Sequence, residues 1–157
     1  MMQLILWRHA DAEDPGGKPD TERNLTKKGR AQAAKMAGWL SSRIDKDWRI
    51  LVSPARRTLQ TVEPLGLPHE LADAVGLAAT AETLLDAAGW PDAKRNVLVV
   101  GHQPTLGDAA AILLGGDEGL SFRKGAIWWF TARERDGRAE TVLKLVMTPE
   151  EVEDAAK

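Results

Sequence analysis

Two of the chain's three histidines, His9 and His102, lie where a short apolar run ends. Arg8 precedes the first of them, and Arg57 lies shortly after a third apolar run. An arginine guanidinium presents a planar fork to two phosphate oxygens. A histidine imidazole can attack phosphorus, and its charge changes near neutral pH. If the fold brings these four side chains together, they predict a site for a phosphate group.

Three predicted strands must position these side chains. They are the apolar runs 2–7, 48–52 and 97–100, and the first and last lack the polar alternation of a half-exposed strand. Ligands of open α/β sheets bind beyond the carboxyl ends of the strands. Adjacent, parallel strands would therefore bring the two histidines and Arg57 to one edge. Either histidine alone would more often be a structural residue, so the joint pattern carries this prediction.

The other segments are predicted to be loops, helices and strands in alternation. The first half contains a polar loop at 13–24, a helix at 27–43 capped by Thr26, and a helix from about 55 that Pro64 or Gly66 ends. An edge strand at 69–71, a helix at 78–88 and a helix from Pro104 to about 115–116 follow. The chain then forms strands at 126–132 and 141–147 joined by Asp136-Gly137, and it ends in a frayed or short helical tail after Pro149. This order predicts a three-layer α/β/α fold. Its central sheet would be mostly parallel, with about six strands and one of them antiparallel.

The composition excludes several classes of protein. The chain has 157 residues, 28% charged and 43% hydrophobic, which suits one globular domain over 1–157. A formal net charge of −2 argues against a general binder of nucleic acid or of a membrane surface. The absence of cysteine excludes disulfides and thiol catalysis. Without an apolar run of membrane-spanning length or a signal-peptide pattern, a cytoplasmic protein is expected.

Four segments resemble motifs of the histidine phosphatase superfamily, and they occur in the family's order. They are LWRHADA at 6–12, LTKKGRAQA at 25–33, SPARRTLQT at 53–61 and GH at 101–102. Each motif is weak alone, but the set is specific. The short chain, and Ala10 where much of the superfamily has Gly, resemble the SixA-type phosphohistidine phosphatases. The resemblance implies a phosphoglycerate mutase-like fold and a phosphatase acting on phosphohistidine in signalling or phosphotransfer proteins.

The resemblance also implies roles for the four candidate residues. His9 corresponds to the nucleophile, which would form a phospho-His9 intermediate that water then hydrolyses. Arg8 and Arg57 would hold the phosphoryl oxygens as negative charge spreads over them. Their charges would also favour the neutral imidazole of His9. His102 corresponds to a further donor to the phosphoryl oxygens.

Two more arginines lie near these motifs. Arg23 resembles an arginine often found before the second motif, and it is a candidate substrate-binding residue at the pocket mouth. Arg56 is adjacent to Arg57, but the spacing from Ser53 assigns the motif position to Arg57. The sequence leaves open whether Arg23 and Arg56 belong to the pocket.

A proton donor is not evident in the sequence. In the superfamily it would lie between the third motif and Gly101, where this chain offers Glu70, Asp73, Glu82 and Asp86 outside any convincing motif. An alkoxide leaving group needs a proton, whereas the imidazole of phosphohistidine leaves more easily. A site without a committed acid, and without a large lid, therefore favours a phosphohistidine carried on a protein.

Three functions stay open at this point. The first is a metal-independent phosphohistidine phosphatase acting on a phosphotransfer or signalling protein. The second is a broad phosphomonoesterase of the same superfamily acting on small phosphorylated molecules. The third is a phosphate-binding module without turnover, which would use Arg8, Arg57 and His102. No nucleotide-binding loop and no standard zinc-site spacing is present, so no cofactor or metal is expected.

Overall fold

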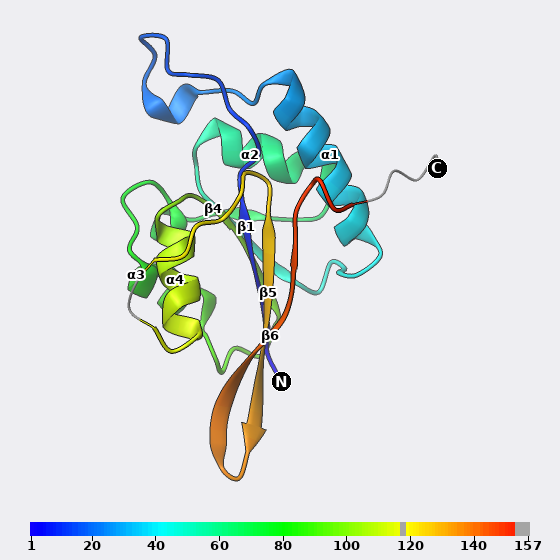
Figure 1. Cartoon of the computed structure of the whole chain (residues 1–157), viewed down its shortest axis with the longest axis vertical. Helices are drawn as coiled ribbons and strands as arrows, with labels where there is room; N and C mark the ends of the chain where they lie inside the picture. The colour runs from blue at the N-terminus through cyan, green and yellow to red at the C-terminus, as the bar shows by residue number, and fades with distance from the viewer. Residues whose placement is uncertain (117–118, 153–157) are drawn as a thin grey trace.

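The computed structural model describes residues 1–116 and 119–152, and its centre is a six-stranded sheet (Figure 1). The strands are β1 (Gln3–Arg8), β2 (Arg49–Val52), β3 (Glu70–Leu71), β4 (Val97–Gly101), β5 (Ile127–Arg135) and β6 (Arg138–Met147). The helices are α1 (Lys27–Ser41), α2 (Arg56–Val62), α3 (Ala81–Ala88) and α4 (Thr105–Leu113). Short 3₁₀ helices lie in the connections: η1 (Asp20–Glu22), η2 (Glu63–Leu65) and η3 (Asp73–Val75).

The strand order is β3-β2-β4-β1-β5-β6. Neighbouring strands from β3 to β1 are parallel, whereas β5 is antiparallel to both β1 and β6. The predicted mostly parallel sheet with one antiparallel strand is therefore confirmed. Because β4 lies between β2 and β1, the three strands that lead into the candidate site are adjacent and parallel.

Helices cover both faces of the sheet and give the predicted three layers. Successive side chains of a strand point to opposite faces. Leu4 and Leu6 of β1 share one core with α3 and α4, and Ile5 and Trp7 share another with α1. Figure 1 shows α3 and α4 on one side of the sheet and α1 on the other. No helix within residues 1–116 or 119–152 has the length and apolar character needed to cross a membrane.

Some helix boundaries differ from prediction because local hydrogen bonds decide them. α3 begins at Ala81 rather than at 78, since the Thr80 hydroxyl oxygen accepts the backbone N–H of Thr83 and caps the helix. α1 ends at Ser41 rather than at 43, because the Arg43 N–H donates to the Leu40 carbonyl, three residues back, instead of to the carbonyl four residues back. The prediction for the tail after Pro149 falls largely on 153–157, outside the described residues.

The hairpin that joins β5 and β6 has the predicted turn. Asp136 and Gly137 both have positive φ, 52° and 75°, as the two central residues of a type I′ turn require. Pairing continues up to Arg135 and Arg138, so both strands extend beyond the apolar runs that predicted them.

The start of α1 packs directly against the segment that leaves β1. A Cβ on Gly29 would overlap the backbone carbonyl of Asp11, so only glycine fits there. The Thr26 hydroxyl donates to the Asp11 carboxylate over 2.6 Å, and the Thr26 N–H donates to the Asp11 carbonyl over 3.0 Å. These contacts fix the backbone close to His9.

Candidate active site

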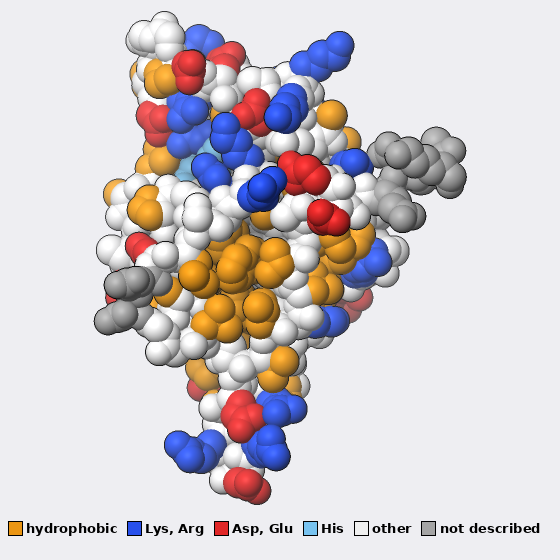
Figure 2. Space-filling model, viewed as in Figure 1, with side chains coloured by type: hydrophobic (Ala, Val, Ile, Leu, Met, Phe, Trp, Pro, Cys, Tyr) orange, Lys and Arg blue, Asp and Glu red, His pale blue; other side chains and the backbone are white. Residues whose placement is uncertain are grey.

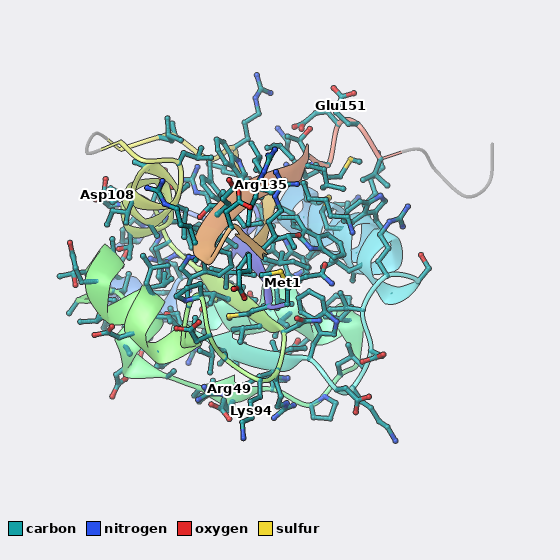
Figure 3. The ribbon with its side chains drawn as sticks, turned by 90° about the horizontal axis from the view of Figure 1, so that it is seen from below. Met1, Arg49, Lys94, Asp108, Arg135 and Glu151 are labelled. Atoms are coloured by element: carbon teal, nitrogen blue, oxygen red, sulfur yellow. The ribbon has the colours of Figure 1, made fainter. Side chains whose placement is uncertain are left out.

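The carboxyl ends of β1, β4 and β2 bring Arg8, His9, Arg57 and His102 together, and we call the site that these four residues form the pocket. The rings of His9 and His102 lie 5.4 Å apart, centroid to centroid. His9 is 7% exposed, His102 4% and Arg57 3%, although all three carry polar side chains. In Figure 2 the pale blue of histidine shows within a cluster of Lys and Arg side chains. The geometry therefore places two buried imidazoles beneath a positively charged surface.

The His9 ring has a defined orientation. Its Nδ1 lies 2.7 Å from the Ala10 carbonyl, which can only accept, so Nδ1 carries the proton and Nε2 keeps a lone pair. The Ala10 N–H donates to the Thr61 hydroxyl over 3.1 Å, and that hydroxyl donates to the Arg57 carbonyl. α2 therefore anchors the turn that holds the ring, and Nε2 is the atom available for attack on phosphorus.

Both imidazoles of the pocket favour their neutral form. Burial, together with the charges of Arg57, Arg8 and Arg23, lowers the pKa of His9 to about 4, although the hydrogen bond with the Ala10 carbonyl opposes this. Burial lowers the pKa of His102 to about 3, with Arg57 as the next cause. The predicted direction for His9 was right, but its largest cause is loss of water rather than the arginine charges.

His102 is held by Ser53, a residue of the third motif to which the sequence assigned no role. Its Nε2 lies 2.7 Å from the Ser53 hydroxyl. The Ser53 backbone is fixed in turn, because its N–H donates to the Val100 carbonyl and its carbonyl accepts the Thr58 hydroxyl. The other ring nitrogen of His102, Nδ1, is buried without a partner.

In both arginines of the pocket, terminal guanidinium nitrogens donate hydrogen bonds, whereas the Nε atom has no partner. Arg8 Nη1 donates to the Phe122 carbonyl over 2.7 Å. Arg57 Nη1 donates to the Asp20 carbonyl over 2.7 Å, and Nη2 donates to the Asp20 carboxylate over 3.0 Å. The Nε atoms of both arginines are buried without a partner.

Three buried side-chain nitrogens are therefore unpaired in the part of the chain that the structure describes, and all three lie in this pocket. They are Arg8 Nε, Arg57 Nε and His102 Nδ1. Buried polar groups nearly always have partners, so unpaired ones indicate an absent ligand. The arginine nitrogens can only donate, and this fits a ligand with several acceptor oxygens.

The structure separates Arg23 from Arg56. Arg23 Nε donates to the Glu13 carbonyl over 2.7 Å, its Nη1 contacts the Asp20 carboxylate, and its charge acts on His9. Arg56 is exposed at the start of α2, while its neighbour Arg57 is buried. Arg23 thus shares Asp20 with Arg57, whereas no contact with the pocket is shown for Arg56.

None of the four acidic residues considered from the sequence is shown in contact with the pocket. Glu70 pairs with Arg49 at the start of β2, the end of the sheet away from the pocket. Glu82 and Asp86 are exposed on α3, in line with the solvated face that their spacing predicts, and Asp73 is exposed in η3.

Asp20 is the acidic residue that does contact the pocket, and sequence reasoning missed it. It lies in the polar loop, and its only sequence signal is the three-residue spacing to Arg23. Hydrogen bonds from Arg23 and then Arg57 lower the pKa of its carboxyl, although its own partial burial opposes this. Asp20 is therefore a carboxylate near neutral pH and is poorly suited to donate a proton.

A metal site is not formed by the described residues. Within 1–116 and 119–152, no cluster of three or more His, Asp or Glu side chains could hold a metal ion. The unpaired nitrogens of the pocket include two arginine N–H groups, which cannot bind a cation. The chemistry of this donor set is that of an anion site.

Comparisons with known proteins match these motifs to one family. The model of the histidine phosphatase superfamily (branch 1) matches residues 4–86, a span that contains Arg8, His9 and Arg57. The phosphohistidine phosphatase SixA of Escherichia coli (strain K12) is 31% identical over 140 residues. These residues cover 80% of this chain and 83% of that protein.

Solved structures share the whole fold. A protein histidine phosphatase SixA complexed with tungstate has a TM-score of 0.77 and 28% identity, covering 97% of this chain and 100% of that chain. The SixA of Agrobacterium tumefaciens has a TM-score of 0.78 and 25% identity, covering 94% of this chain and 98% of that chain. The predicted phosphoglycerate mutase-like architecture is confirmed. The chain therefore belongs to the SixA-type branch of the histidine phosphatase superfamily and is a phosphatase.

Proposed function

We propose that this phosphatase hydrolyses phosphohistidine carried on a protein, with His9 as the nucleophile. The observation that carries the proposal is the pocket's composition. A neutral imidazole with a free Nε2 lies in the same site as buried, unpaired nitrogens, and the carboxylate that contacts the site is ionised. A related SixA binds tungstate, a tetrahedral oxyanion, which supports an oxyanion site here.

The proposed reaction has two steps. His9 Nε2 attacks phosphorus, the new P–N bond forms, and the P–N bond to the substrate ring breaks. Water then attacks the phosphoryl group on His9, which releases inorganic phosphate and restores the imidazole. During both steps Arg8 and Arg57 donate to the phosphoryl oxygens and stabilise their developing charge.

His102 would act as a neutral donor in these steps. If the Ser53 hydroxyl donates to Nε2, the single ring proton resides on Nδ1, the nitrogen without a partner. That N–H would then point at a phosphoryl oxygen. Arg23 would add positive charge at the edge of the pocket and help to capture the substrate.

The leaving group decides between the proposed substrate and a phosphate ester. An ester leaves as an alkoxide and needs a proton from an acid. The pocket carboxylate is held in its ionised form, so it supplies no proton. An imidazole leaves without one if its ring is already protonated on the other nitrogen. These arguments support a phosphohistidine substrate on a phosphotransfer or signalling protein of the cytoplasm.

Hydrolysis assays with EDTA present test the proposal. Rates would be compared for a phosphohistidine-bearing phosphotransfer protein, a phosphohistidine peptide, sugar phosphates and p-nitrophenyl phosphate. We expect the highest kcat/KM for the phosphorylated protein. Higher kcat/KM on the sugar phosphates would instead identify a small-molecule phosphomonoesterase. Binding of phosphate without turnover of any substrate would identify a binding module, and loss of activity with the chelator would contradict the mechanism.

A further inference from the structure

The loop residue Asp20 bridges two arginines of the pocket. Its carboxylate accepts Arg57 Nη2 over 3.0 Å and Arg23 Nη1 over 3.1 Å, one on each oxygen, and its carbonyl accepts Arg57 Nη1 over 2.7 Å. Each terminal nitrogen of Arg57 thereby donates one hydrogen bond to Asp20, while its Nε is unpaired. Asp20 thus fixes the plane of a guanidinium whose Nε–H is buried and unpaired.

Asp20 also lies between the pocket and solvent. The Arg57 side chain is 4% exposed, whereas the Asp20 side chain that contacts it is 49% exposed. The carboxylate therefore lies beyond the Arg57 guanidinium, on the side toward solvent. Because its partners favour ionisation, it offsets part of the positive charge of Arg23 and Arg57 on the side toward solvent.

The leaving group must occupy this outer side. Phosphoryl transfer places the attacking and leaving atoms roughly in line. Because His9 lies at the buried end of the site, we infer that the group opposite its Nε2 lies on the solvent side. A charge on that group is then felt by Asp20 at short range, where a unit charge changes binding by several-fold even in partly aqueous surroundings.

We propose that Asp20 determines substrate specificity: it positions Arg57 and favours substrates whose leaving group is neutral or cationic over those with an anionic group beside the phosphate. For the substrate class, the inference rests on the proposed function. A phosphohistidine ring protonated on its unphosphorylated nitrogen is such a cation. When its P–N bond breaks, the electron pair stays on the ring nitrogen and neutral imidazole leaves, so the enzyme transfers no proton.

Two esters of opposite charge test this without depending on P–N chemistry. Phosphoethanolamine and phosphoglycolate have similar size, but the first carries an ammonium and the second a carboxylate. Their binding would be measured by calorimetry on His9→Ala protein, which prevents turnover, with and without Asp20→Asn. We expect Asp20→Asn to shift the affinity ratio toward phosphoglycolate by about 3- to 10-fold.

A matched control lies in the same short helix. Glu22 is exposed, and no side-chain contact to the pocket is shown for it, so Glu22→Gln removes the same charge without touching Arg57. We expect it to change the ratio by less than about twofold, since an exposed distant charge is screened. An unchanged ratio in Asp20→Asn, or an equal shift in Glu22→Gln, would overturn the specificity role.

The positioning role has its own readout. With His9 intact, Asp20→Asn keeps one side-chain oxygen that can accept from an arginine, whereas Asp20→Ala keeps only the backbone carbonyl. We therefore expect kcat for a phosphohistidine peptide to fall more in Asp20→Ala than in Asp20→Asn, at similar melting temperature. Equal kcat values would contradict positioning. If no variant, wild type included, cleaves the peptide, the proposed function fails, while the ester-binding ratio still decides the role of Asp20.

Discussion

The pocket floor and the pocket rim are built in different ways. The floor consists of Arg8, His9, Arg57 and His102, at or just beyond the ends of adjacent strands or at the start of α2. The rim is the loop 13–24, which contacts the floor through the hydrogen bonds of Asp20 with Arg57. His9, Arg57 and His102 of the floor are buried and Arg8 is half-buried, whereas the rim is largely exposed. This difference suggests that the floor performs the chemistry and the rim selects what reaches it.

Replacement of His9 should have the largest effect and tests the floor directly. His9→Ala removes the proposed nucleophile, so turnover should fall to background. The arginine donors stay in place, and phosphate or vanadate should still bind. Measurement requires steady-state assays and calorimetry, with any phosphorylated intermediate of the wild type trapped under alkaline conditions because phosphohistidine is labile in acid. Substantial activity in His9→Ala, or a trapped phosphate on another residue, would show the covalent mechanism to be wrong.

Arg57 and Arg56 offer the next test, because they are adjacent in sequence but differ in burial. Arg57→Ala removes a charged donor from the transition state and should lower kcat on the order of 10² to 10³, or about 2.7 to 4 kcal/mol. Phosphate binding should weaken too, since the same donor contacts the resting ligand. Arg56→Ala is the matched control and should leave kcat/KM within about twofold. Similar losses in both variants would remove the distinction between the buried and the exposed arginine.

The pH dependence of the floor follows from its buried imidazoles. With the pKa of His9 lowered to about 4, the nucleophile is neutral at pH 7 and becomes protonated only as the pH falls through about 4. The intrinsic rate should therefore fall about tenfold for each pH unit below that value. An NMR titration of the His9 ring measures this pKa directly, without interference from the ionisation of the substrate phosphate. A ring that titrates near 6.5 would contradict the burial argument.

The lowered pKa values of His9 and His102 also make the stability of the fold depend on pH. The fold favours the neutral imidazoles, so their contribution to the free energy of unfolding is complete above the pKa of a histidine in the unfolded chain, near 6.5. That contribution is lost as the pH falls toward the lower pKa values of His9 and His102 in the folded chain. Chemical denaturation between pH 7 and 4 should therefore show declining stability. His102→Asn, which cannot be protonated in this range, should flatten that decline. An unchanged slope would show that other groups cause it.

The sequence predicted the floor better than the rim, for a physical reason. Apolar runs reveal strands, and parallel strands bring their ends together, so the convergence of His9 and His102 follows from pattern alone. The contact of Arg57 with Asp20 joins side chains 37 residues apart, and the contact of Ser53 with His102 joins side chains 49 apart. Neither leaves a periodic signal. Helix ends such as that of α1 were likewise misplaced where a single hydrogen bond decides them.

Arg23 should give the smallest effect, and it tests whether the rim acts on binding alone. Its side chain is 22% exposed and adds positive charge near His9 without touching the ring in any described contact. Arg23→Ala should raise KM by about 3- to 10-fold, because partly screened charge contributes modestly, and should change kcat little. Lys18→Ala is the control, since Lys18 carries the same charge in the same loop but pairs with the exposed Glu13. A fall in kcat comparable to that of Arg57→Ala would place Arg23 among the floor residues and would end the division of roles between floor and rim.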